Sequence, residues 1–321
     1  MRILITGGAG FIGSHLCDKY TEEGHSVLCL DNFMAGTPVN VRHLLDHPNF
    51  KLINGDIRDY ELLEEVMRDV DAVFHLAAQG NVDKSYVRPR LTYDVNVMGT
   101  QNILETARLH NTKKVIYAST SEVHGTSLYN PMDEKHPLDA PHPYGASKTA
   151  ADRMCFAYIQ TYDMNIAIVR FFNVFGPRQR STSYGAVIPI FTRRVLSDMP
   201  PIIYGDGKQT RDFTYVKDAV KAYDLVLNHS EPITEPVNFG SGKEVSIIDL
   251  ANMIIDLCGK TGTIKPVHAE PRTSEVKRLI ANATKAKNLL GWEPEYDLEN
   301  GLREFVQWYR NHRFEERNEV E

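Results

Sequence analysis

The chain has 321 residues, an apolar fraction of 42% and a formal net charge of −6 at pH 7. This length can bury a large α/β core, in one unit or in two domains that share an interface. The acidic balance argues against nucleic acid or anionic membranes as partners, although a local arginine cluster can still bind an anionic small molecule. No apolar run approaches the ~20 residues that a membrane-spanning helix requires.

The cysteines are scattered and form no C-x-x-C pair, which predicts buried free thiols in a reducing compartment. Met1 and Arg2 lead directly into an apolar run, so we expect no signal peptide and a cytoplasmic location. We expect no metal site. The four cysteines are Cys17, Cys29, Cys155 and Cys258.

The first half of the chain alternates short apolar runs with segments of helical spacing. This alternation predicts an α/β fold with a doubly wound parallel sheet and helices on both faces. The predicted strands are residues 2–6, 26–31, 50–55, 71–77, 113–120 and 165–171, and the predicted helices are residues 11–23, 59–68, 89–110 and 144–162.

After Gly176-Pro177 the segments shorten and turn residues become denser, which predicts a smaller C-terminal α+β lobe. We divide the chain into residues 1–175 and 176–321, with a blurred boundary because the last strand of the sheet can come from the second half. The predicted helices of this half are residues 185–197, 216–228, 246–258 and 298–310.

A glycine-rich turn, TGGAGFIG at residues 6–13, lies between the first strand and the first helix. Gly7 suits a tight turn, Gly10 lets the backbone approach a pyrophosphate, and Gly13 permits close packing of helix and strand. The helix N-terminus, with Phe11 and Ile12, then offers free N–H groups to phosphates. The turn therefore predicts a dinucleotide site.

Asp31 ends the second strand, eighteen residues after Gly13, where a carboxylate can accept hydrogen bonds from both ribose hydroxyls. Because this carboxylate would repel a 2′-phosphate, NAD is favoured over NADP as the cofactor. Asp31 can alternatively be a turn or N-cap residue. The other residues expected to contact the cofactor are Asn32, Asp56, Ile57, Leu76, Ala77, Ala78 and Ser119.

Tyr144 and Lys148 stand at i, i+4 spacing in PYGASK, so both project from one face of a helix. An ammonium beside a phenol is expected to lower the phenol pKa and favour a phenolate that accepts a hydroxyl proton. Such a pair can also be a solvated surface pair. The hydroxyl-rich strand end STSEVHG, at residues 119–125, favours the catalytic interpretation.

With these motifs the sequence resembles the extended short-chain dehydrogenase/reductase family, in its nucleotide-sugar branch. The resemblance covers nearly the whole chain and includes HLAA at 75–78, NVMGTQNILE at 96–105, RFFNVFGPRQ at 170–179, GDGKQTRDFTYVKD at 205–218 and LLGWEP at 289–294. It implies a Rossmann-type NAD domain, a C-terminal lobe that holds a nucleoside diphosphate sugar, and a homodimer built from the helices at 89–110 and 144–162.

The resemblance also implies a reaction that starts with oxidation at sugar C4, assisted by Thr120, Tyr144 and Lys148. A 4,6-dehydratase then needs a base for the C5 proton, and Glu122 matches the family's glutamate. Ser121 precedes it, as in the guanosine-type dehydratases, and NVDKS at 81–85 is also similar to the dehydratase pattern. Nucleotide-sugar 4,6-dehydratase is therefore the favoured function.

Three alternatives stay open. UDP-glucuronate decarboxylases share the Thr-Ser-Glu triplet, and residues 36–50 are similar to their early segment. A nucleotide-sugar 4-epimerase needs no acid after the threonine, and Glu122 can be a plain surface carboxylate. A non-catalytic NAD-sensing scaffold would not need Tyr144 and Lys148.

The resemblance also implies contacts to the sugar diphosphate from Asn173, Arg211 and Arg272, since guanidinium groups can bind phosphate oxygens bidentately. His124 departs from the family, which mostly has tyrosine there. This departure can reflect packing or an altered pocket.

Overall fold

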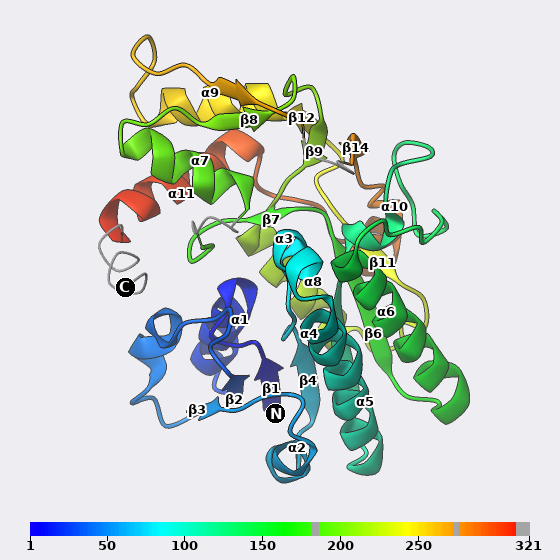
Figure 1. Ribbon diagram of the computed structural model, residues 1–321. Coiled ribbons are helices and arrows are strands. Elements are labelled where there is room, and N and C mark those ends of the chain that lie inside the picture. The colour runs from blue at the N-terminus through cyan, green and yellow to red at the C-terminus, as the bar shows by residue number, and fades with distance from the viewer. Residues whose placement is uncertain (181–185, 272–275, 313–321) are drawn as a thin grey trace.

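The computed structural model describes residues 1–180, 186–271 and 276–312. Seven strands of these ranges form one sheet in the order β11-β6-β5-β4-β1-β2-β3, with every neighbouring pair parallel (Figure 1). The predicted doubly wound sheet is therefore confirmed. The strands are β1 (Arg2–Thr6), β2 (Ser26–Asp31), β3 (Phe50–Asn54), β4 (Ala72–His75), β5 (Lys114–Thr120), β6 (Ile166–Phe171) and β11 (Val237–Phe239).

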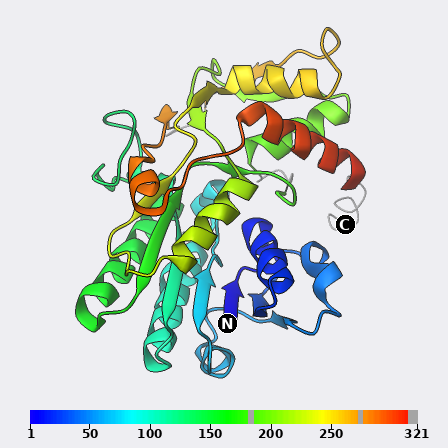
Figure 2. The same cartoon turned by 180° about the vertical axis from the view of Figure 1, so that it is seen from behind.

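Helices cover both faces of this sheet, as the two opposite views show (Figures 1 and 2). Successive side chains of a strand point to opposite faces, so β1 contributes to two cores. Ile3 and Ile5 lie in one core with residues of α1 and α8, whereas Leu4 lies in the other with residues of α2, α5 and α6. The helices are α1 (Phe11–Glu22), α8 (Val216–Asn228), α2 (Tyr60–Val66), α5 (Gly99–Leu109) and α6 (Pro143–Tyr162).

The predicted helix at 89–110 is a run of three consecutive helical segments. Its middle segment, Asp94–Met98, is a π-helix, flanked by α4 (Pro89–Tyr93) and α5. A short helix that the sequence analysis did not predict, α3 (Val82–Val87), precedes it and is capped by Asn81, whose side chain accepts a hydrogen bond from the Lys84 N–H. A 3₁₀ segment at Pro38–Leu44 was also not predicted.

The C-terminal half builds a further core, separate from the two cores of the sheet, and also returns to the sheet. Helices α7 (Val187–Leu196), α9 (Ile247–Leu257) and α11 (Leu298–His312) pack together there. The prediction placed residues 216–228 in this lobe, but α8 covers the parallel sheet. Strand β11 forms the edge of that sheet, as the sequence analysis allowed for a last strand from the second half. The remaining elements are β7 (Val174–Phe175), β8 (Ile202–Tyr204), β9 (Thr210–Asp212), β10 (Thr214–Tyr215), β12 (Glu244–Ser246), β13 (Val267–Ala269), β14 (Arg278–Leu279) and α10 (Thr284–Leu290).

All four cysteines are buried and free, as predicted. Within the described ranges, every helix is too short or too polar to cross a membrane.

Candidate active site

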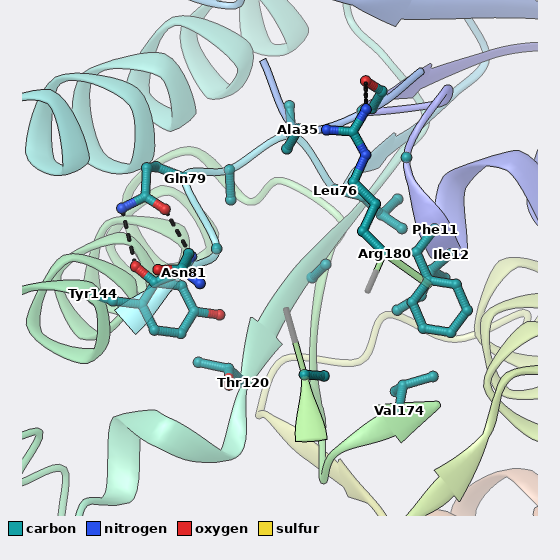
Figure 3. A pocket seen from close by; sticks show the side chains of 18 of the residues that line it. Phe11, Ile12, Ala35, Leu76, Gln79, Asn81, Thr120, Tyr144, Val174 and Arg180 are labelled. Carbon is teal, nitrogen blue, oxygen red and sulfur yellow. Dashed lines mark hydrogen bonds between the residues drawn. The ribbon is translucent and has the colours of Figure 1, made fainter. Parts of the chain in front are cut away.

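A cavity of about 1240 Å³ lies at the carboxyl ends of the parallel strands, where the strand order reverses between β1 and β4. Open α/β sheets bind ligands at this position because the loops after the two strands diverge there. The opposite wall includes Val174 (Figure 3), and the C-terminal half contributes Arg211 and Phe213 to the lining. Every predicted site residue within the described ranges lines this cavity.

The glycine-rich turn forms one end of the cavity. Gly7 has a φ of +68°, and a Cβ at this position would lie 2.8 Å from the Ala77 backbone nitrogen. Only glycine therefore allows the turn after β1 to lie against the loop after β4. The N-terminus of α1, with Phe11 and Ile12, faces the cavity beyond it (Figure 3). This cradle fits the pyrophosphate of a dinucleotide.

Two carboxylates lie beside this cradle at the ends of β2 and β3. Asp31 accepts hydrogen bonds from the N–H groups of Ala9 (3.0 Å) and Phe33 (2.8 Å), which fix its carboxylate at the cavity wall. Burial raises the pKa of Asp31, and these hydrogen bonds oppose that effect. Each oxygen keeps a second lone pair for a ribose hydroxyl.

Asp56 is bound from one side by the Arg58 guanidinium, with Nη2–Oδ2 at 2.7 Å, and by the Asn32 amide at 2.8 Å. The hydrogen bonds from Arg58 lower the pKa of Asp56 to about 2. Asp56 is therefore ionised near neutral pH.

Tyr144 directs its hydroxyl into the cavity, and Thr120 lies next to it at the end of β5 (Figure 3). Lys148, one helical turn further along α6, is buried beneath the same wall. Its Nζ donates a hydrogen bond to the Ala118 carbonyl at 2.6 Å and lies 4.3 Å from the centre of the Tyr117 ring. The spacing thus places both side chains on one face of the helix, as predicted.

The predicted lowering of the Tyr144 pKa is wrong for the protein groups alone, because the net shift is upward. Burial raises the pKa of Tyr144 to about 12, although the hydrogen bond with the Thr120 hydroxyl opposes this effect. Burial also lowers the pKa of Lys148 to about 8. The reason is that the Lys148 ammonium is directed at a backbone carbonyl, while burial penalises the charged form of both groups.

Glu122 lies in the 3₁₀ turn Ser121–His124 that directly follows β5, and its side chain reaches the cavity. Its Oε2 is 3.1 Å from Nε2 of His142, which caps the N-terminus of α6. A Cβ on Gly145 would lie 2.8 Å from the Glu122 carbonyl oxygen. Glycine at this position therefore lets the start of α6 pack closely against the turn that carries Glu122.

Asn173 and Arg211 line the far wall of the cavity. The Asn173 amide donates to the Asp212 carbonyl at 2.9 Å, and Arg211 Nη1 donates to the Thr210 carbonyl at 2.9 Å. Arg272 lies outside the described residues. His124 is fully buried against the His136 ring and is not among the residues that line the cavity. Its departure from the family therefore reflects packing and not an altered pocket. Burial lowers the pKa of His124 to about 4, so it is neutral near pH 7.

The lining residues that were not predicted from the sequence include His142, Gln79 and Arg180. Gln79 is held by Asn96, whose Oδ1 accepts the Gln79 N–H at 2.7 Å. Arg180 extends across the cavity and donates to the Gly36 carbonyl at 3.1 Å (Figure 3). Of the three, only His142 carried a local signal, because histidine is an unusual residue directly before a helix that starts with proline.

A family model described as GDP-mannose 4,6 dehydratase matches residues 4–305. The chain is 42% identical over 311 residues to "Putative UDP-glucose 4-epimerase" of Methanocaldococcus jannaschii, covering 96% of this chain and 98% of that protein. It is 37% identical over 314 residues to UDP-glucuronic acid decarboxylase 1 of Xenopus tropicalis, covering 96% of this chain and 72% of that protein.

Among solved structures, the chain is similar to the dTDP-glucose 4,6-dehydratase DesIV of Streptomyces venezuelae, whose crystal structure has NAD bound. The TM-score is 0.92 and the sequence identity is 32%, over 98% of each chain. These similar proteins are named for three different reactions on nucleotide sugars, so similarity alone does not choose among the reactions.

Proposed function

This chain belongs to the family described as GDP-mannose 4,6 dehydratase, and on that premise we propose that it is an NAD-dependent nucleotide-sugar 4,6-dehydratase. The observation that carries the choice of reaction is Glu122, a carboxylate that lines the same cavity as Thr120 and Tyr144. A 4-epimerase needs no such group, whereas elimination of water needs a base for the C5 proton.

In the first step, Tyr144 accepts the proton of the sugar O4, and the Thr120 hydroxyl orients that oxygen. Gly7, Gly10, Gly13 and Asp31 would hold NAD, which would supply the acceptor and later the donor of the hydride that moves from C4 to C6, and a positive ring charge that would favour the phenolate. The Lys148 ammonium favours the same charge state. Together these charges offset the burial that raises the pKa of Tyr144 to about 12.

In the second step, Glu122 takes the C5 proton, which the new C4 carbonyl makes acidic. The C6–O bond breaks and the hydroxyl leaves as water after it receives one proton, a transfer that Ser121 can assist. The hydride adds to C6, and C5 regains a proton. The two protons released from O4 and C5 equal the two consumed, so the net products are a 4-keto-6-deoxy sugar nucleotide and water.

The far wall of the cavity is proposed to hold the nucleoside diphosphate. Asn173 and Arg211 stand on this wall, and we also assign Arg272 to this role from its motif. Guanidinium groups can bind phosphate oxygens bidentately. In this arrangement residues 1–175 hold NAD and the catalytic side chains, and residues 176–321 supply most of the nucleotide-sugar contacts.

Two other reactions remain candidates because of specific observations. Similarity to UDP-glucuronic acid decarboxylase 1 supports decarboxylation of UDP-glucuronate, and the similar archaeal protein named for epimerisation supports a 4-epimerase. We favour dehydration over epimerisation because of the position of Glu122. We favour it over decarboxylation because the family resemblance implies a different tyrosine segment in decarboxylases from the PYGASK of this chain.

The reactions can be distinguished by incubating the protein and NAD with UDP-glucose, dTDP-glucose, GDP-mannose, CDP-glucose and UDP-glucuronate. We expect a product lighter by one water, with the base-induced absorbance of a 4-keto-6-deoxy sugar. Release of carbon dioxide would establish the decarboxylase instead, and an isomer of unchanged mass the epimerase. Tight NAD binding without turnover of any sugar would favour the scaffold.

The role of Glu122 is tested by Glu122→Gln. We expect this variant to retain C4 oxidation, seen as transient absorbance of the reduced nicotinamide, while elimination of water falls by at least ~100-fold. Tyr144→Phe is the matched control, because it should lose both steps. Equal loss of both steps in Glu122→Gln would remove this residue from the proposed role.

A further inference from the structure

We propose that His142 is a positioning residue, which holds the Glu122 carboxylate in the orientation that removes the C5 proton of the sugar. The inference rests on the proposed function, since it deepens the role of Glu122. It is carried by two hydrogen bonds of a single imidazole ring, one from the backbone of α6 and one to the carboxylate.

The first hydrogen bond fixes the tautomer of the ring. The Gly145 backbone N–H donates to Nδ1 of His142 at 3.0 Å, in the N-cap position of α6. A backbone amide can only donate, so Nδ1 must be the unprotonated nitrogen of the ring. The hydrogen of the neutral imidazole is therefore on Nε2.

The second hydrogen bond follows from the first. Nε2 of His142 lies 3.1 Å from Oε2 of Glu122, and with its hydrogen it donates to the carboxylate. The backbone of α6 thus sets the direction of a donor to the proposed base. A backbone group that fixes a histidine tautomer, while the other ring nitrogen serves the site, is a recurring arrangement in enzymes.

The His142 ring is buried and packed between two tyrosine rings, which restricts its orientation. His142 is only 5% exposed. Its ring is parallel to that of Tyr144, with centroids 6.1 Å apart, and the Tyr86 ring meets it edge-on at 6.3 Å. Because His142 and Tyr144 start the same helix, the proposed base is positioned relative to the proposed C4 oxidation centre.

This arrangement assigns different roles to the two oxygens of Glu122. Oε2 is held by His142, which leaves Oε1 as the oxygen that meets the C5 proton. A general base is effective only when it is placed correctly against the proton that it removes, and the hydrogen bond from His142 supports that placement. Both ring nitrogens are engaged, Nδ1 by the Gly145 N–H and Nε2 by Glu122, so we assign the ring no part in proton transfer.

Two substitutions separate the two hydrogen bonds. His142→Ser keeps an N-cap acceptor for α6, because serine is among the preferred N-cap residues, but its short side chain cannot reach Glu122. His142→Gln keeps a donor of sufficient length for Glu122 and replaces the cap by a poor one. The first variant tests the positioning role, and the second tests the structural role of the same residue.

The measurements are solvent deuterium incorporation at C5, transient reduced nicotinamide in a single turnover, and KM, with dTDP-glucose, UDP-glucose, GDP-mannose and CDP-glucose as the probes. For the probe that is turned over, His142→Ser should lower kcat and C5 exchange by about 10- to 100-fold, with C4 oxidation and KM nearly unchanged. His142→Gln should restore most of the C5 exchange although its melting temperature is lower. Equal loss of both steps in His142→Ser would overturn the proposal.

A double variant connects the effect to Glu122. In the Glu122→Gln background, His142→Ser should cause no further loss of C5 exchange, because both substitutions remove the same function. If Glu122→Gln alone leaves elimination intact, the proposed function fails. If Glu122→Gln blocks elimination while His142→Ser does not, the proposed function stands and the positioning role of His142 is wrong.

Discussion

Lys148 shows how a residue required by the proposed chemistry can lower the stability of the fold. Burial lowers its pKa from the ordinary value of 10.5 to about 8. Below pH 8 the folded and unfolded states both carry the ammonium, and the folded state bears the full cost of burying it. As the pH rises from 8 to 10.5, the folded state loses the proton first and this cost disappears, so stability rises with pH.

We therefore predict that Lys148→Met abolishes activity and removes this rise, of which ~2 kcal/mol of unfolding free energy falls between pH 8 and pH 10. Urea unfolding at pH 8 and pH 10 measures the difference. The control is Lys51→Met, because Lys51 is exposed on β3. This variant should show the same pH dependence of stability as the native protein. An equal rise in native protein and Lys148→Met would contradict the prediction.

The sequence predicted the side chains of the proposed site that lie within contiguous motifs. Glu122, Tyr144 and Lys148 follow a strand end or start a helix, and local spacing is sufficient to place them. Arg180 could not be found this way, because its contact with the Gly36 carbonyl joins residues 144 positions apart. The direction of the Tyr144 pKa shift was also missed, because i, i+4 spacing gives no information on burial.

At the scale of elements, Lys114 connects β5 to the C-terminal end of α8. Its Nζ donates to the carbonyls of Val226 (2.9 Å), Leu227 (3.2 Å) and His229 (2.7 Å). These carbonyls lie where an α-helix has unsatisfied acceptors and negative partial charge. The buried Lys114 ammonium thus links α8, a helix of the C-terminal half, to β5 of the sheet by hydrogen bonds.

Lys114→Met should cost about 2 to 3 kcal/mol of unfolding free energy, because three carbonyls lose a charged donor in a place that water reaches poorly. The neighbouring Lys113 offers the control. Its side chain is 80% exposed and pairs with Asp71, so Lys113→Met should cost no more than about 1 kcal/mol. Chemical denaturation of both variants measures the two values, and equal costs would rule out the linking role of Lys114.

Helical periodicity located the long helix at 89–110 but not its internal change of geometry. The π-helical segment Asp94–Met98 contains Asn96, whose amide donates to the Gln79 carbonyl and to the Ser147 hydroxyl. Both partners belong to other segments of the chain, the loop after β4 and helix α6. Contacts of this kind depend on the assembled fold and leave no trace in the spacing of apolar residues.

At the scale of the whole molecule, the cavity is built from both halves of the chain. Helix α8 and strand β11 come from the C-terminal half but complete the parallel sheet, while α7, α9 and α11 form a separate core. An apolar stripe on a helix predicts that one face is buried, but not against which partner. For this reason the sequence predicted both the parallel-sheet domain and the C-terminal lobe, but it assigned α8 to the lobe although the helix packs on the sheet.

Exposed apolar side chains near helices α5 and α6 bear on the oligomeric state. Helices α5 and α6 pack against each other, and large apolar side chains nevertheless stay exposed along this part of the fold. Met98, Leu109 and Tyr162 are 49%, 48% and 50% exposed. Exposed apolar groups on adjacent helices are typical of a surface that another chain covers. We therefore propose a homodimer in which these helices pair with those of a second copy.

Sedimentation equilibrium should give about twice the monomer mass of 36.4 kDa for the native protein. Met98→Lys combined with Leu109→Lys should shift the protein to the monomer, because each buried charge without a partner opposes association. Val267→Lys is the matched control, because Val267 is 43% exposed on β13 of the C-terminal lobe. This substitution should leave the dimer intact. A native monomer, or a dimer that survives both lysines, would show that these helices do not form the interface.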